Sequence, residues 1–203
     1  MSYKSYQKSR DAAWEILIRH RVGALPVDVI SICRAEHIYM FPYSTHKTEL
    51  DALGLAEHAR STDGFSVRLG GHDLIFYGDR KSRQRQRFTI AHELGHFING
   101  DVSDRPTYRN TEPSDDDDEK ETAANRVACR ILSPACVLWR LGLTEPEEIA
   151  LNCDISITAA RWRSKRMKEL LARDEMFRRT RGRSCFLQSP LERAVFYQFF
   201  PKG

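Results

Sequence analysis

The five residues His92-Glu93-Leu94-Gly95-His96 constrain the fold more than any other part of this 203-residue chain. Two histidines at positions i and i+4 lie on the same face of an α-helix, so both imidazoles can reach one metal ion. Apolar residues flank the five, and Gly100 follows as a candidate C-cap, so the sequence predicts a helix over residues 83–99. Gly95 inside that helix costs about 1 kcal/mol relative to alanine, which indicates that another segment packs closely against it.

Glu93 follows the first histidine directly and therefore points beside the metal rather than at it. A carboxylate in that place can take a proton from an activated water and later deliver it to a leaving amine. Imidazole and carboxylate ligands suit Zn²⁺, which binds in a tetrahedron and can keep one position for water. The pattern therefore predicts a catalytic zinc site with His92 and His96 as ligands. Two incidental histidines on a surface helix are the simpler alternative.

A catalytic zinc site needs a third protein ligand, and the sequence does not supply it as a nearby histidine. Val102 stands where the metzincin pattern requires one. The favoured candidate is Glu121, at the start of a helix predicted over residues 121–132, with Glu119 and Glu112 as alternatives. The alternative is that Glu121 binds no metal, because the helix dipole by itself favours an acidic residue at the start of a helix.

Residues around Glu121 support its choice as a ligand. The small side chains of Ala123 and Ala124 permit a close approach to the helix that carries the two histidines. Asn125 lies one helical turn after Glu121, on the same face, and could accept a hydrogen bond from an imidazole. We therefore expect Asn125 to orient one of the zinc ligands.

Two segments together resemble the ImmA/IrrE family of metallopeptidases. Residues 87–96 read RFTIAHELGH, and residues 121–134 contain E-x-x-A-N and end in I-L-S-P. The sequence Leu25-Pro26-Val27-Asp28 and a glycine-rich hairpin also fit, so the resemblance covers roughly residues 10–135. It departs from the family in two places: I-L-S-P replaces the usual L-L-M-P, and Cys129 stands where small or acidic residues are common. Neither difference touches a predicted ligand.

The resemblance implies a zincin-like core related to the gluzincins, with zinc held by His92, His96 and Glu121 and with Glu93 as the base. It also implies a substrate, because members of the family cut a partner transcriptional repressor of the helix-turn-helix type in bacteria and in phage-derived or mobile elements. We therefore expect a bacterial zinc-dependent endopeptidase that cuts such a repressor.

Peptide hydrolysis also needs a hydrogen-bond donor for the oxyanion. Composition alone offers Tyr108, Arg105, Arg109 and His72. The first three lie in the polar, acidic segment 101–118, between the two predicted metal-binding helices. A connection this long is often functional, and we expect it to border the substrate cleft and to become ordered on binding.

The remaining patterns predict an α+β fold, with a metallopeptidase domain over residues 1–140 and a helical segment over residues 141–203. Strands are expected over residues 37–41, 65–69 and 73–77, the last two joined by a hairpin at Gly70-Gly71. Helices are expected at both ends of the chain and between the strands, and three tryptophans, Trp14, Trp139 and Trp162, fit core positions. The expected helices span residues 9–22, 26 onward, 47–59, 145–152, 156–172 and 191–200, with a basic connector before the last.

Residues 145–172 are similar to a helix-turn-helix in which Ser156 caps the second helix. Its basic residues could contact phosphates, and they are Arg161, Arg163, Lys165 and Arg166. A packing module that covers the core, or a surface that docks the repressor, explains the pattern equally well, and DNA binding is not favoured. The competing function is a DNA-binding or repressor-binding regulator with a non-catalytic metal site.

Composition excludes several other classes of protein. The longest apolar runs are far shorter than the roughly 20 residues that cross a bilayer, and the first residues contain no apolar leader. The 5 cysteines include no C-x-x-C pair, which argues against a disulfide framework or a cysteine-rich zinc site. We therefore expect a cytoplasmic protein that does not interact with membranes.

Overall fold

The computed structural model describes residues 3–102 and 115–201, and the chain divides into two compact units. The first unit comprises Met1–Ala12 and Val29–Ala128, and the second comprises Ala13–Asp28 and Cys129–Gly203. Two helices contribute residues to both units, α1 (Tyr3–Arg19) and α6 (Asp115–Leu132). This division differs from the predicted boundary after residue 140, because the second unit takes in an early segment of the chain.

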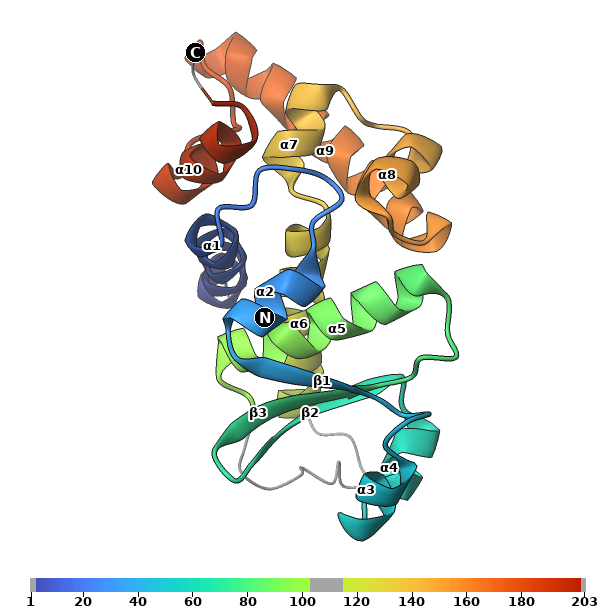
Figure 1. Ribbon diagram of the computed structural model, residues 1–203. Helices are drawn as coiled ribbons and strands as arrows, with labels where there is room; N and C mark the ends of the chain where they lie inside the picture. Colours follow the sequence, from blue (N-terminus) through green and yellow to red (C-terminus); the bar gives the residue numbers. More distant parts are fainter. Residues whose placement is uncertain (1–2, 103–114, 202–203) are drawn as a thin grey trace. The chain divides into compact units, whose positions relative to one another are not determined.

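A three-stranded sheet organises the first unit (Figure 1). The strands are β1 (Ile38–Pro42), β2 (Gly64–Leu69) and β3 (His72–Tyr77), in the order β1-β3-β2. β3 runs parallel to β1 and antiparallel to β2, so β3 is central and each of the other strands forms an edge. Gly70 and Gly71 join β2 to β3 with φ values of 57° and 80°, a conformation that favours glycine. The predicted hairpin and the α+β class are thus confirmed.

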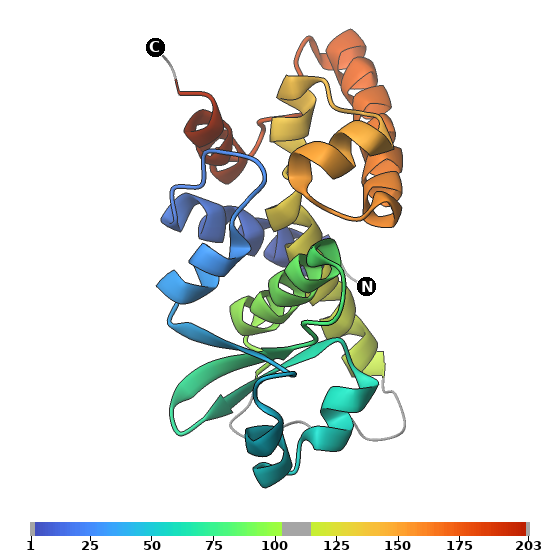
Figure 2. The same cartoon turned by 45° about the vertical axis from the view of Figure 1, so that its right-hand side comes forward.

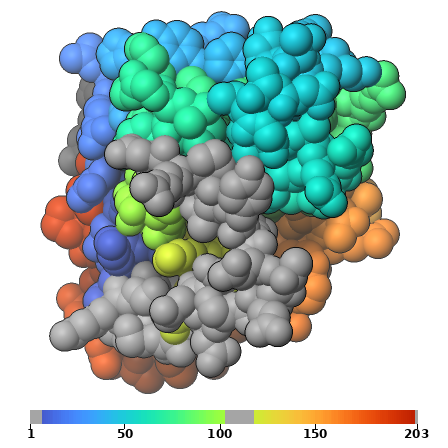
Figure 3. Space-filling model, turned by 90° about the horizontal axis from the view of Figure 1, so that it is seen from below, coloured from blue at the N-terminus to red at the C-terminus, as the bar shows by residue number. Residues whose placement is uncertain are grey.

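Helices pack on both faces of this sheet (Figure 2). On one face, α5 (Arg83–Asn99) contacts β2 and β3, and α2 (Val29–Ala35) contacts β1 and α5. On the other face, Leu50 of α3 (Lys47–Ala52) and Leu55, just before α4 (Ala56–Ser61), pack against aromatic side chains of the strands. Seen from below, α3 and α4 form the cyan surface beside the green surface of the hairpin (Figure 3). Two short helices therefore replace the single helix predicted over residues 47–59, and Gly54 between them has a φ of 70°.

The helix that carries the two histidines has the predicted bounds. The side chain of Ser82 accepts a hydrogen bond from the backbone N–H of Arg85, and Gly100 ends the helix with a φ of 79°. By contrast, α6 begins at Asp115 rather than at Glu121. The acidic run at residues 115–118, predicted to lie in a loop, is the first turn of this helix, where the dipole favours negative charge.

The second unit is helical. It contains α7 (Ala135–Leu141), α8 (Pro146–Cys153), α9 (Ile157–Arg181) and α10 (Pro190–Phe199), together with the second half of α1. The sequence did not predict α7, and α9 continues through the predicted basic connector because nothing before Gly182 breaks it. Trp139 stacks on Phe186 in this core, whereas Trp162 is 71% exposed, so its predicted core position was wrong.

None of the helices in the described part of the chain combines the length and the apolar character needed to cross a membrane.

Candidate metal centre

The site is built where α5 and α6 approach each other closely. A Cβ added at Gly95 would lie 2.9 Å from the carbonyl oxygen of Ala124 and 3.0 Å from its Cα. Ala124 is fully buried, and its small side chain leaves room for this approach. The segment predicted to pack against Gly95 is therefore the backbone of α6, and the contact sets the separation between the two helices.

This approach brings one carboxylate to both histidines. Nε2 of His92 lies 3.2 Å from one carboxylate oxygen of Glu121, and Nε2 of His96 lies 3.2 Å from the other. The two Nε2 atoms are 3.1 Å apart. In a tetrahedral zinc site with ligand distances of about 2.0–2.1 Å, neighbouring ligand atoms are about 3.3 Å apart. Among the described residues, these three form a group that could hold a metal ion.

The second nitrogen of each imidazole faces an oxygen atom, which is within hydrogen-bond distance for His92 and farther away for His96. Oδ1 of Asn125 lies 3.0 Å from Nδ1 of His92 and accepts its hydrogen bond. A carboxylate oxygen of Asp101 lies 3.6 Å from Nδ1 of His96. With the protons on Nδ1, both Nε2 lone pairs point at each other and at Glu121. Acceptors placed so closely require a positive charge between them, so the donor set fits a bound cation.

The electrostatics of the cluster lead to the same conclusion. Burial would lower the pKa of His96, but its hydrogen bond to Glu121 and the charges of Glu93, Glu121 and Asp101 raise it. Burial would raise the pKa of Glu121, yet hydrogen bonds and charge from both histidines hold it well below its usual range. The pocket thus stabilises positive charge at the point where the three side chains meet.

Glu93 lies on α5 beside the cluster and is only 5% exposed. The start of β2 covers it: a Cβ at Gly64 would lie 3.8 Å from Cγ of Glu93 and 2.3 Å from Cγ2 of Thr89. A pocket of about 290 Å³ opens here, and its walls include Glu93, His92, Glu121 and Asn125. A carboxylate thus borders the same pocket as the three metal-ligating candidates, which is the arrangement that a general base needs.

The mouth of this pocket carries a small charge network. The carboxylate of Asp63 forms ion pairs of 2.5 Å with Arg85 and 3.1 Å with Lys81. Burial would raise the pKa of Asp63, but its hydrogen bonds and the charges of these two cations lower it. One acid shared by two cations leaves a net positive charge at this edge of the pocket. Phe88 also lines the pocket.

Several predicted site residues are not brought to the cluster. His72 pairs with Leu69 at the hairpin end of β3, and its ring packs against Tyr39, whereas Gly64 pairs with Tyr77 at the end nearest the site. Glu119 is exposed on α6 and is not part of the metal-ligating group. Four candidates lie outside the described residues, namely Arg105, Tyr108, Arg109 and Glu112, as does most of the predicted cleft segment 101–118.

Asp101 is a site residue that the sequence did not reveal. It follows the C-cap Gly100, and its backbone N–H donates a hydrogen bond of 2.9 Å to the carbonyl oxygen of His96. The left-handed turn at Gly100 thus folds the chain back, so that the buried carboxylate faces the ring one turn earlier. The available signal was an acidic residue directly after the glycine that ends the histidine helix.

The family Peptidase_M78, described as an IrrE N-terminal-like domain, matches residues 44–150, which is more than half of the chain. The match includes α5 and α6, and with them all residues of the cluster. A search among curated proteins finds no match.

Proposed function

We propose that this chain, which belongs to the Peptidase_M78 family with its IrrE N-terminal-like domain, is a zinc-dependent endopeptidase. One observation carries the proposal: the ligand atoms of His92, His96 and Glu121 converge at 3.1–3.2 Å in an open pocket that Glu93 also lines. A purely structural metal site would be closed by a fourth protein ligand. Among the described residues, no further histidine, cysteine or acid joins this group.

The chain's own residues have separable roles in the proposed reaction. A zinc ion held by the three ligands would polarise the scissile carbonyl and lower the pKa of a water molecule. Glu93 accepts a proton from that water as its oxygen adds to the carbonyl carbon. Glu93 then donates the proton to the amide nitrogen as the carbon–nitrogen bond breaks, so that the amine leaves neutral. Asn125 accepts a hydrogen bond from Nδ1 of His92, which leaves Nε2 of that ring for the metal, and the carboxylate of Asp101 favours a proton on the Nδ1 side of His96.

The proposed substrate is a helix-turn-helix transcriptional repressor, cut in an exposed and extended segment. Support for the partner comes from the resemblance to the ImmA/IrrE family. Support for an extended segment comes from the pocket itself, which is bounded by the start of β2 on one side and by α5 and α6 on the other. Such walls admit a backbone more readily than a folded helix.

The competing function, a DNA-binding or repressor-binding regulator, would use α8 and α9. Of the four basic residues predicted to meet phosphates, Arg163 donates a hydrogen bond to the carbonyl of Ser133, and Arg166 pairs with Glu169 at 2.8 Å. Arg161 and Lys165 are exposed. The first turn of α8 also presents Glu147 and Glu148, both exposed, which would repel phosphates. Salt-dependent association of the protein with DNA would favour this alternative.

The Glu93→Gln variant tests the proposal, with Glu57→Gln as the matched control. Glu57 is exposed on α4, so its substitution makes the same chemical change away from the site. Metal analysis should find one zinc per chain in both variants. New protein N-termini in cells should appear with wild type and Glu57→Gln but not with Glu93→Gln.

Each component of the proposal can fail separately. A zinc-loaded wild-type protein that generates no new N-termini would contradict the peptidase activity. New N-termini confined to proteins other than transcriptional repressors would overturn the substrate but not the chemistry. Stoichiometric zinc in His92→Ala or Glu121→Ala would show that other residues bind the metal.

A further inference from the structure

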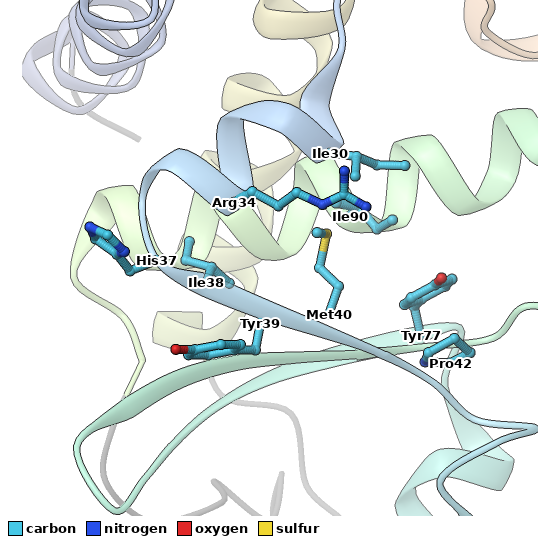
Figure 4. Close-up of a pocket in the computed structure, with 9 residues that line it drawn as sticks. All are labelled: Ile30, Arg34, His37, Ile38, Tyr39, Met40, Pro42, Tyr77 and Ile90. Carbon is cyan, nitrogen blue, oxygen red and sulfur yellow. The ribbon is translucent and has the colours of Figure 1, made fainter.

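We propose that a groove along the outer edge of β1 docks an extended, acidic segment of a partner protein, which adds to the sheet as a further strand. The groove has a volume of about 360 Å³, and we define it by Ile30, Arg34, His37, Ile38, Met40 and Ile90 (Figure 4). It shares no residue with the pocket at the metal centre. The proposal therefore goes beyond peptide hydrolysis and does not depend on it.

The backbone of β1 is free to accept another strand. In the described part of the chain, β1 pairs with β3 alone. The N–H of Tyr43 donates to the carbonyl of Tyr77 in β3 at 2.9 Å. Backbone groups alternate in direction along a strand, so those of Tyr43 and of every second residue before it face β3. The N–H and C=O groups of Ile38 and Met40 therefore point away from it. Pro42, which lacks an N–H, ends this unpaired stretch, as is common at sheet edges.

The side chains beside that edge form an apolar floor. Ile38 and Met40 project toward the face of the sheet that α2 and α5 cover, and Ile90 of α5 and Ile30 of α2 complete the groove. In an added strand, every second side chain would point into this floor. Hydrogen bonds along the edge would supply affinity, and the groove would select apolar or flexible side chains.

Charge identifies the acidic character of the partner. Arg34 lies in the last turn of α2, is exposed, and has no ion pair among the described residues. Figure 4 shows its guanidinium group above Met40, with His37 toward one end of the groove. No aspartate or glutamate of the described chain lines the groove. A carboxylate on the docked strand would thus meet a cation that forms no ion pair with the described residues.

Peptide titration followed by NMR tests the proposal. The zinc-loaded full chain carries Glu93→Gln so that a probe is not cut, and the probes are heptapeptides of alternating valine with glutamate or valine with lysine. The glutamate peptide should shift the amide signals of Ile38 and Met40. Arg34→Glu should weaken its binding roughly fivefold and strengthen that of the lysine peptide. Arg60→Glu, an exposed change on α4 with the same effect on net charge, should do neither.

Further outcomes decide against the groove. N-methylation of alternate backbone nitrogens in the glutamate peptide removes the donors that strand pairing needs, so unaltered binding would overturn the proposal. Signal changes away from β1, or equal binding of both peptides to wild type and Arg34→Glu, would also overturn it. A dimer in solution whose formation depends on Arg34 would show that a second copy, rather than an acidic partner, occupies the edge.

Discussion

Gly95 on α5 lies directly against the backbone of Ala124 on α6, so that a Cβ at Gly95 would meet the Ala124 carbonyl oxygen at 2.9 Å. Glu121 lies one turn earlier on α6 and reaches Nε2 of His92 and of His96 at 3.2 Å. The missing side chain at residue 95 thus sets the distance at which the carboxylate meets the imidazoles. Alanine has a higher helix propensity than glycine, so propensity alone would favour alanine at residue 95.

Gly95→Ala is expected to lower the free energy of unfolding by about 1–3 kcal/mol, since overpacking outweighs the gain in helix propensity. Zinc affinity should fall as well, because α6 must move and takes Glu121 with it. Urea unfolding and competition with a chelator measure the two effects. A variant more stable than wild type would show that the helices are not in close contact.

Asp101→Asn should weaken zinc binding by about 10–100-fold, because the carboxylate that faces Nδ1 of His96 and raises the pKa of that ring is lost. The fold should persist, since the backbone hydrogen bond from residue 101 to the His96 carbonyl is unchanged. Asp73→Asn is the control: Asp73 pairs with Arg68 at 2.6 Å on the hairpin. Equal zinc affinity in the two variants would show that Asp101 does not contribute to zinc binding.

Zinc binding should depend on pH through His96. The carboxylates around it raise its pKa above the ordinary 6.5, so a proton competes with the metal at higher pH than usual. Apparent affinity should rise by about tenfold per pH unit while one proton is released, and should level off above the pKa of His96. In Asp101→Asn the plateau should begin at lower pH. Calorimetry in buffers of different ionisation enthalpy would count the protons, and an affinity independent of pH would refute the linkage.

Gly64→Ala should destabilise the first unit, because the new Cβ would lie 2.3 Å from Cγ2 of Thr89 and 3.1 Å from the carbonyl oxygen of Phe76. A loss of about 1–3 kcal/mol is typical of overpacking. Thr89→Ser removes that methyl group, so the double variant should recover part of the loss. Thermal unfolding of all four proteins completes the cycle. Strictly additive effects would mean that the start of β2 does not touch α5 at Thr89.

Asp174 should stabilise the second unit in a pH-dependent way. Burial would raise its pKa, but hydrogen bonds from Ser184, Arg178 and the backbone N–H of Cys185 lower it below 3.8. A lowered carboxyl pKa adds stability above the unfolded value near 3.8, and the gain is lost as pH falls through the folded value. Asp174→Asn should therefore cost about 1–3 kcal/mol at neutral pH and progressively less in acid. Urea unfolding at several pH values measures it, and a pH-independent difference would contradict this account.

Local signals predicted part of the fold well. The helix over residues 83–99 has its predicted bounds because Ser82 and Gly100 cap it through contacts within a few residues. Gly70 and Gly71 likewise fix the hairpin without help from distant parts of the chain. The prediction failed where distant packing decides, as for the exposed Trp162.

The sequence by itself determined that His92 and His96 lie on one face of a helix with Glu93 beside them, and it offered Glu121 as the candidate third ligand. Only the tertiary structure decided that Glu121 meets both imidazoles, that Asp101 turns back to His96, and that β1 is an edge strand of the sheet that the described residues form. Helical spacing and caps depend on neighbours in sequence. The crossing of two helices and the order of strands depend on packing between segments far apart in the chain.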